Sequence, residues 1–405
     1  MNELPEGWVV KKLGDVCETT SGGTPNRKDS SLYGGHIPWV KSGELDKGII
    51  TDTEEKITDE AIKKSSAKVF PKGTLLIALY GATIGKLAFL GIAAATNQAI
   101  CGIFENKSID SKYLYQFLFF SKAGLVKQGI GGAQPNISQG ILKNLDLPLP
   151  PLPIQHAIVT KIEEIFSELD HGVAQLKVAR AQLKVYRQAV LKWAFEGKLT
   201  NEGVVDGELS EGWKFVKIGT VVKCIVPNRD KPKSFSGNIP WLTTPDLDEG
   251  SVSINFSGIK NGLSKEEAVE YKAKVIPLDS VVMTCVGKFG VAAVVTKEIV
   301  INQQLHAFLP SEVFLPKYIA YNIINQKTYC ESKSTSTTIA YLNKENCNSI
   351  PIPLCPLPEQ HQIVTEIERR LSVCDKLEET IEAGLKQAEV LRAGVLKMAF
   401  EGGLV

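Results

Sequence analysis

The loop most suggestive of catalysis runs from Gly81 through Gly85 and Lys86 to Leu87. It resembles a phosphate-binding P-loop, but three residues separate the glycines where such a loop has four. Leu87 also stands where the P-loop has the Ser or Thr that binds magnesium. We therefore expect a turn here and not a nucleotide site.

The other residue patterns that carry chemistry are largely missing. The sequence has no Asn-Pro-Pro-aromatic or Asp-Pro-Pro-aromatic tetrapeptide of an amino-methyltransferase and no convincing Gly-x-Gly-x-x-Gly turn. Its 8 cysteines never form Cys-x-x-Cys, and its 5 histidines form no His-x-x-x-His or Glu-x-x-His pair, so we expect buried reduced thiols and no metal site. Paired carboxylates of a nuclease stay open because Asp and Glu are abundant. The sequence therefore favours binding over catalysis. The alternative, an enzyme with its own catalytic centre, would require activity from the purified chain alone.

Polar loops offer a different chemistry. They are rich in Arg, Lys, Asn, Gln, Ser and Thr, whose donors and acceptors can read base edges in DNA, although plain surface turns share this composition. Net charge is +1, but positive residues gather locally in residues 107–143 and 214–233. This segregation fits a phosphate-binding face or, equally, a solvated lysine face. The loops are residues 24–28, 134–136, 227–231 and 332–338.

The chain that must position these loops has 405 residues, so two or more domains are expected. Hydrophobic residues make up 43% and charged residues 22%, which is ordinary globular composition. No apolar run approaches the roughly 18 to 20 residues of a membrane span, and no secretory signal opens the sequence. We expect a cytoplasmic protein.

An internal repeat organises the whole sequence. Glu6-Gly7-Trp8 recurs 205 positions later as Glu211-Gly212-Trp213, and Ile37-Pro38-Trp39 recurs as Ile239-Pro240-Trp241. The last 50 residues of the two copies are nearly identical in places, whereas residues 20–35 and 225–238 share almost nothing. Two copies of one frame with different inserts predict a pseudo-twofold molecule with two different ligands.

Each copy ends in a long predicted helix. Residues 155–195 and their repeat carry apolar or small residues at alternating steps of three and four, which is a heptad pattern. We expect the two helices to pack antiparallel as a rigid spacer; the alternative is two surface helices, each covering its own domain. The seam residues chosen for this interface are Ile162, Leu169, Leu176, Leu183, Val190, Ile367, Leu377, Ile381, Leu391 and Val395.

The remaining segments mix short apolar strands with one helix each, near residues 111–120 and 317–324, which predicts an α/β (α+β) class. Proline-rich linkers lead into both long helices. The predicted domains are residues 1–150, the first helix 151–199, a second globular domain 200–355 and the second helix 356–405.

These features carry a family resemblance. Leu4-Pro5-Glu6-Gly7-Trp8, Gly81 to Lys86, and Leu147 to Gln155 running into the first helix resemble the DNA specificity subunit of type I restriction-modification systems. Pro356-Leu357-Pro358-Glu359-Gln360-His361 resembles its second repeated region, while the first copy has Ile154 before Gln155 where Glu is usual. The resemblance covers essentially the whole chain.

The resemblance implies a non-catalytic subunit with two target-recognition domains that bind a bipartite, asymmetric DNA target. It also implies two methyltransferase subunits docked on the helices and a restriction translocase in the larger complex, with S-adenosylmethionine, ATP and magnesium on those partners. If the methyltransferase partner flips the target adenines out of the duplex, the task of this chain would be to position those adenines. A non-catalytic coiled-coil scaffold that joins proteins without reading DNA is the alternative.

The predicted DNA contacts divide by chemistry, since Lys suits phosphates while Asn, Gln and Arg suit base edges. They are Asn26, Arg27, Lys28, Lys41, Lys86, Gln98, Gln134 and Asn136 in the first domain, and Asn228, Arg229, Lys231, Lys233, Thr243, Lys288, Gln303 and Thr337 in the second.

Overall fold

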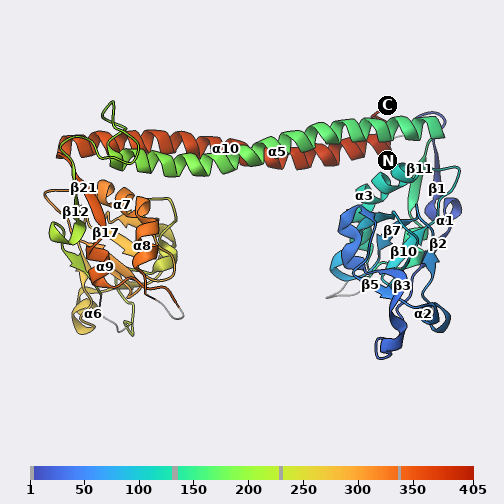
Figure 1. Ribbon diagram of the computed structural model, residues 1–405, viewed down its shortest axis with the longest axis horizontal. Coiled ribbons are helices and arrows are strands. Elements are labelled where there is room, and N and C mark those ends of the chain that lie inside the picture. Colours follow the sequence, from blue (N-terminus) through green and yellow to red (C-terminus); the bar gives the residue numbers. More distant parts are fainter. Residues whose placement is uncertain (1–3, 130–135, 228–230, 336–338) are drawn as a thin grey trace. The chain divides into compact units, whose positions relative to one another are not determined.

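The computed structural model describes residues 4–129, 136–227, 231–335 and 339–405 and divides into two compact units (Figure 1). Unit 1 joins residues 1–176 to residues 383–405, and unit 2 is the continuous segment 177–382. Each unit therefore contains part of both long helices. Within the described residues, no helix combines the length and apolar character needed to cross a membrane.

Unit 1 is a mixed α/β structure, as expected. Its strands form a five-stranded sheet in the order β2-β10-β7-β8-β4, a four-stranded sheet in the order β5-β3-β9-β6, and the pair β1-β11. The strands are β1 (Val9–Lys12), β2 (Thr19–Ser21), β3 (Tyr33–Val40), β4 (Ile49–Ile50), β5 (Glu55–Ile57), β6 (Val69–Phe70), β7 (Leu75–Ala78), β8 (Leu87–Leu90), β9 (Ala94–Thr96), β10 (Ile100–Ile103) and β11 (Asp146–Leu149). The helices are α1 (Leu13–Val16), η1 (Ser30–Leu32), η2 (Ser42–Lys47), α2 (Asp59–Lys64), η3 (Gly81–Thr83), α3 (Ser111–Gln128) and α4 (Gln139–Lys143).

Unit 2 repeats this plan with shorter strands. Its sheets have the orders β13-β20-β17-β18 and β15-β14-β19-β16, with β12-β21 as the separate pair. The strands are β12 (Lys214–Lys217), β13 (Cys224–Ile225), β14 (Ile239–Leu242), β15 (Gly262–Leu263), β16 (Val275–Ile276), β17 (Val281–Thr284), β18 (Ala292–Val294), β19 (Ile299–Ile301), β20 (Leu305–Phe308) and β21 (Pro351–Leu354). The helices are η4 (Ile218–Thr220), η5 (Thr244–Asp246), η6 (Phe256–Gly258), α6 (Lys265–Glu270), α7 (Pro316–Asn325), α8 (Lys327–Lys333) and α9 (Lys344–Asn348).

The strand register shows that the two copies of the sequence repeat have equivalent structures. Trp39 on β3 pairs in parallel with Ala95 on β9, and Trp241 on β14 pairs in parallel with Val300 on β19. Strands β7 and β17 are buried at every position, as their apolar runs predict for interior strands, although β17 ends in the polar residue Thr284. The loop at Gly81 is a short 3₁₀ turn, so the expectation of a turn there is confirmed.

Two helices of 45 residues each follow the proline linkers: α5 (Leu152–Glu196) and α10 (Leu357–Glu401). A buried glutamine fixes the start of each. Gln155 donates to the carbonyl oxygens of Pro150 (2.8 Å) and Ser108 (3.2 Å) and accepts from the Asp110 amide (2.8 Å). This explains why the Pro-Leu-Pro-x-Gln pattern occurs twice.

The parts of α5 and α10 that share a unit pack against each other antiparallel. In unit 1, Asp170 pairs with Arg392, and the guanidinium of Arg392 lies 4.8 Å from the centre of the Phe166 ring. In unit 2, Arg187 pairs with Asp375 (2.7 Å) and Glu378 (2.9 Å). Residues with higher numbers on α5 therefore contact residues with lower numbers on α10. This supports a packed helix pair over two independent surface helices.

Two of the ten predicted seam residues lie away from the helix interface. Ile162, Leu183, Val190, Ile367, Ile381 and Val395 are buried as expected, and Leu169 and Leu176 are half-buried. Leu377 and Leu391 are 49% and 47% exposed, because the second residue of each heptad lies four positions after the first and not three. Charged residues such as Arg187 and Arg392 occupy that place, with their stems packed and their ends paired across the interface.

The long helices also complete the cores of the two units. Phe400 of α10 packs edge-on against Tyr113 and Phe117 of α3, with ring centres 5.3 Å apart in both cases. Phe195 of α5 makes the equivalent contact with Tyr318 of α7 at 5.0 Å. All eight cysteines are free and buried, as the sequence predicts.

Candidate nucleic-acid interface

The aromatic strand β3 organises the polar residues of unit 1. Trp39 is 1% exposed, and its Nε1 donates to the Gly23 carbonyl oxygen at 3.1 Å. The guanidinium of Arg27 lies 4.7 Å from the Trp39 ring centre and 4.8 Å from that of Tyr33. A planar cation is thus held against two aromatic rings, an arrangement favoured by the ring quadrupoles.

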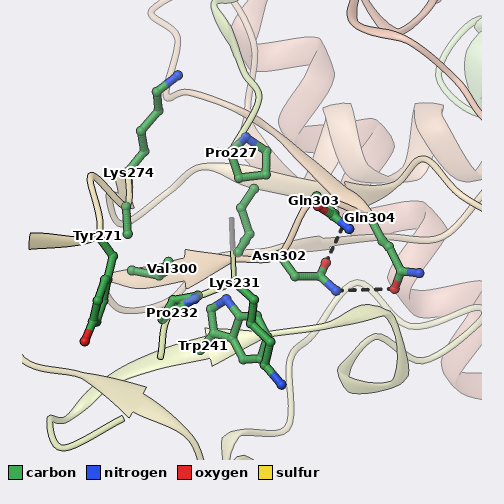
Figure 2. Close-up of a pocket in the computed structure, with 12 residues that line it drawn as sticks. Pro227, Lys231, Pro232, Trp241, Tyr271, Lys274, Val300, Asn302, Gln303 and Gln304 are labelled. Carbon is green, nitrogen blue, oxygen red and sulfur yellow. Dashed lines mark hydrogen bonds between the residues drawn. The ribbon is translucent and has the colours of Figure 1, made fainter. Parts of the chain in front are cut away.

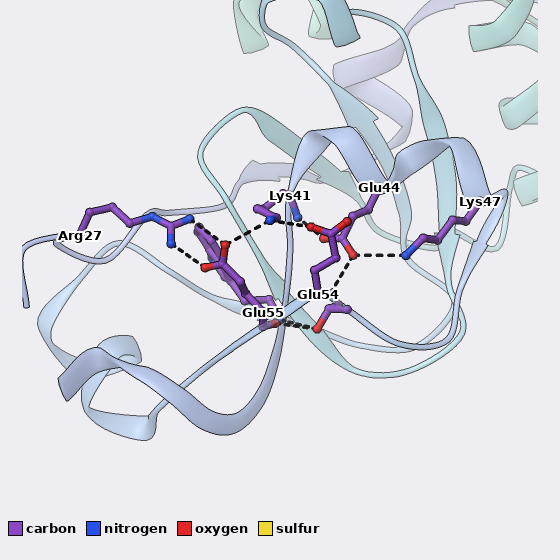
Figure 3. Close-up of polar contacts among 8 residues, drawn as sticks. Arg27, Lys41, Glu44, Lys47, Glu54 and Glu55 are labelled. Carbon is purple, nitrogen blue, oxygen red and sulfur yellow. Dashed lines mark hydrogen bonds and ion pairs between the residues drawn. The ribbon is translucent and has the colours of Figure 1, made fainter. Parts of the chain in front are cut away.

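Glu55 on β5 holds this cation in place (Figure 3). It accepts hydrogen bonds from Arg27 Nη1 at 2.5 Å and from Lys41 Nζ at 3.1 Å, and Glu54 takes a second bond from Lys41 at 2.7 Å. The hydrogen bond from Arg27 is the main cause that lowers the pKa of Glu55 below its usual range. The structure brings Arg27 and Lys41 together at Glu55, so both predicted DNA contacts are already paired with carboxylates.

Glu44 stiffens the neighbouring loop (Figure 3). Its side chain is 3% exposed, and the carboxylate accepts hydrogen bonds from the backbone amides of Lys41 (2.9 Å) and Glu54 (3.1 Å) and from Lys47 Nζ (3.4 Å). These three donors satisfy a buried charge that would otherwise be costly. The loop that carries Lys41 is thereby fixed before any ligand binds.

The other predicted contacts of unit 1 are mostly exposed. Lys86 pairs with Asp46 at 2.5 Å and not with the carboxylates that hold Arg27 and Lys41. Asn26 accepts the Lys28 amide at 3.1 Å in a local turn. Lys28, Gln98 and Asn136 are exposed, and Gln134 lies outside the described residues.

Unit 2 places its predicted contacts differently. Lys231 lies 5.4 Å from the centre of the Trp241 ring, and Gln303 lines the same cavity (Figure 2). Lys233 and Lys288 are exposed, and in the described part of the chain no ion pair involves them or Lys231. The Thr243 amide and hydroxyl both donate to Asp246 at 2.7 Å, so Thr243 caps η5. Asn228, Arg229 and Thr337 fall outside the residues that the structure describes.

Sequence reasoning missed the aromatic and acidic residues of these sites. Tyr33, Glu55 and Tyr271 belong to no polar loop, and Glu55 is 28 residues from Arg27 in sequence, so composition gave no signal for them. The repeated Ile-Pro-Trp tripeptide was the available signal, because it marks the strand around which both sites form. Among the described residues, no three His, Cys, Asp or Glu side chains gather as metal ligands.

The arrangement can bind a polyanion and read polar edges, because it combines cations, amides and aromatic rings on one frame. A family model for the type I restriction modification DNA specificity domain matches the chain twice, over residues 5–177 and 210–387. The chain belongs to this family. The two matches cover both copies of the repeat and most of both long helices.

Individual members of the family are distant in sequence. The MjaIX specificity subunit of Methanocaldococcus jannaschii is 27% identical over 297 residues, which cover 70% of this chain and 67% of that protein. The StySPI specificity subunit of Salmonella potsdam is 23% identical over 423 residues, which cover 99% and 90%.

Solved structures share the fold. A chain from a study of complex assembly and conformational transition in a type I restriction-modification system has a TM-score of 0.79 and 21% identity, covering 100% of both chains. The HsdS subunit from Thermoanaerobacter tengcongensis has a TM-score of 0.63 and 21% identity, covering 99% and 98%. The likeness supports the architecture of two globular repeats and two long helices.

Proposed function

We propose that this chain is the DNA-recognition subunit of a type I restriction-modification complex and that each globular repeat binds one half of a bipartite DNA target. The supporting observation is that one strand frame occurs in both units with unlike side chains around its tryptophan. A pseudo-twofold protein with unlike halves suits a DNA site whose halves differ in sequence. The proposed recognition domains are residues 1–150 and 200–355.

The side chains divide the work by chemistry. Exposed lysines such as Lys28, Lys233 and Lys288 bind phosphates, which sets position on the duplex without reading sequence. Amides such as Gln98 and Gln303 face solvent and read base edges through their paired donor and acceptor. Arg27 contributes to one half-site only, because unit 2 offers a lysine over its tryptophan.

The long helices, with residues 151–199 and 356–405 as the proposed spacer segments, bind two methyltransferase subunits. Apolar side chains that the helix pair leaves exposed support this role: Val185 and Val390 are each 65% exposed, and Leu377 and Leu391 are about half exposed. S-adenosylmethionine, ATP and magnesium belong in this proposal to the methyltransferase and restriction subunits. The chain itself supplies recognition and no chemical step.

Genome-wide adenine methylation tests the proposal. Single-molecule sequencing of the native host with and without this chain should show loss of one split, asymmetric motif. Survival of every motif, with the partner methyltransferase expressed, would instead support a protein scaffold. Binding of the purified complex to that motif should also weaken steeply with salt, whereas apolar docking of proteins would not.

The two halves can be separated by exchange. Replacing residues 200–355 with the equivalent domain of a relative should change one half of the methylated motif and leave the other half intact. Change in both halves would contradict the assignment of one half-site to each repeat.

A further inference from the structure

Unit 2 contains a cavity of about 250 Å³ beside the tryptophan of its Ile-Pro-Trp strand. Figure 2 shows Tyr271 at one side of this cavity, Gln303 and Gln304 at the other, and Trp241 with Pro232 along a wall between them. An engineered protein cavity of about 150 Å³ admits benzene, so the space is ample for a planar ring. The lining combines aromatic rings, amides and lysines, and none of the lining residues is acidic.

The strand register identifies what unit 1 has at the same places. Because Trp39 pairs with Ala95 as Trp241 pairs with Val300, Gln304 corresponds to Ala99. Val69 pairs with Ala95 and Val275 with Val300 in the same way, so Tyr271 corresponds to Ser65. Unit 2 has thus gained an aromatic ring and an amide at two positions that face its cavity.

In unit 2, an asparagine takes the place of the carboxylate that secures the cation in unit 1. Glu55 lies opposite Trp39 on the neighbouring strand, and Asn261 has that place opposite Trp241, where its carbonyl oxygen accepts the Trp241 amide at 2.9 Å. Arg27 is therefore fixed over the ring of Trp39 by an ion pair. Lys231 lies over the Trp241 ring but forms no ion pair with any described residue, so its ammonium can move away from the ring.

The polar side of the cavity is already ordered. Asn302 Oδ1 accepts a hydrogen bond from the Gln304 backbone amide at 3.1 Å (Figure 2). Gln304 Oε1 accepts a hydrogen bond from Thr244 Oγ1 at 3.2 Å. Lys274 donates to the Val226 carbonyl oxygen at 3.0 Å and lies at the rim. A ring that stacks, an edge that hydrogen-bonds and a phosphate attached nearby are the features that this lining would recognise.

We propose that this cavity receives one unstacked nucleobase from the half-site bound by unit 2, at a position other than the methylated adenine. The proposal rests on the proposed function, since it needs this chain to bind DNA. The base lies against Trp241 and Tyr271 in place of the Lys231 ammonium, with its polar edge toward Asn302 and Gln304. Unit 1 reads its half-site without this device, because Arg27 and Tyr33 cover Trp39.

A fluorescent base analogue tests the proposal in the reconstituted complex with its methyltransferase subunits. Once methylation sequencing has given the motif, 2-aminopurine or pyrrolo-cytosine replaces each base of the second half-site in turn. We expect fluorescence to rise on binding at one position that is not methylated. Tyr271→Ser, which installs the residue of unit 1, should abolish the rise and weaken binding about tenfold. Tyr271→Phe keeps the ring and should retain both.

A second variant closes the cavity without removing any lining residue. Asn261→Glu should hold Lys231 over Trp241, as Glu55 holds Arg27, and lower the fluorescence rise, whereas Asn261→Gln should not. A rise confined to the methylated adenine, or binding by Tyr271→Ser within twofold of the parent, would overturn the cavity but leave the proposed function standing. Failure of the parent complex to bind its motif would overturn both.

Discussion

Gln360 at the start of α10 should contribute more to the stability of unit 2 than any surface residue of its size. It is fully buried and donates to the carbonyl oxygens of Cys355 and Val313, both at 2.9 Å, while it accepts the Leu315 amide at 3.0 Å. Gln360→Met keeps the chain length but leaves three backbone groups without this partner.

The expected cost can be summed from these groups. The Cys355 carbonyl bond is buried and costs about 2 kcal/mol to lose, while the two part-buried groups cost about 1 kcal/mol each because water reaches them. The apolar Met side chain offsets about 1 kcal/mol. Gln360→Met should therefore lower the free energy of unfolding of unit 2 by about 3 kcal/mol.

Urea unfolding and amide hydrogen exchange measure this effect. Exchange of the Leu315 amide should accelerate about 100-fold, since each 1.4 kcal/mol is a factor of ten. Gln362→Met, on an exposed face two residues further along the same helix, is the matched control and should change little. A shift below 1 kcal/mol with unchanged exchange at Leu315 would refute the role of the buried glutamine. Gln155→Met should do the same to unit 1 through Asp110.

Three further changes are expected. Burial lowers the pKa of His306 to about 4, so the unfolded chain binds the proton first as pH falls below about 6.5. The free energy of unfolding should therefore drop by about 3 kcal/mol between pH 6.5 and 4. Urea titrations should show a flatter pH dependence for His306→Gln. Gly290 has a φ of +71° and a built Cβ would lie 2.6 Å from that of Lys327, so Gly290→Ala should cost about 2 kcal/mol by the same titration, while Gly258→Ala, in open space, should not. Phe400→Ala should destabilise unit 1 by about 3 to 5 kcal/mol, seen as a lower Tm, with exposed Phe119→Ala as the control.

Each of these has a contradicting result. Equal pH dependence in the parent and His306→Gln would mean that other groups titrate. A Gly290→Ala protein as stable as the parent would mean that Lys327 and the backbone relax freely. Phe400→Ala with an unchanged Tm would mean that the end of α10 does not complete the core of unit 1.

The repeat carried most of what the sequence could predict. It located both long helices to within a few residues and pointed to the strands of Trp39 and Trp241. The repeat could not predict the order of strands in the sheets. For example, β14 pairs with β19 across 56 intervening residues, and no local sequence feature encodes that pairing. The helix seam failed at Leu377 for a related reason, since a heptad pattern permits steps of three then four or four then three.

The candidate site was less predictable than the fold. Arg27 was identified from its polar loop and Lys41 was predicted as a DNA contact, but their pairing with Glu55 depends on a strand that lies 28 and 14 residues away in sequence. Composition shows which residues can bind DNA, whereas only the strand register shows which of them the protein already uses for itself.

The division of the chain also fixes an order of folding during synthesis. Unit 2 is one continuous stretch, residues 177–382, and is synthesised in full before residues 383–405 of unit 1. Unit 1 must wait for residues 383–405, because Phe400 fills its core beside Tyr113. The usual N-terminal-first order on the ribosome is thereby reversed. Nascent chains should expose an unfinished first unit to chaperones until residues 383–405 are made, and truncation before Phe400 should destabilise the half that was translated first.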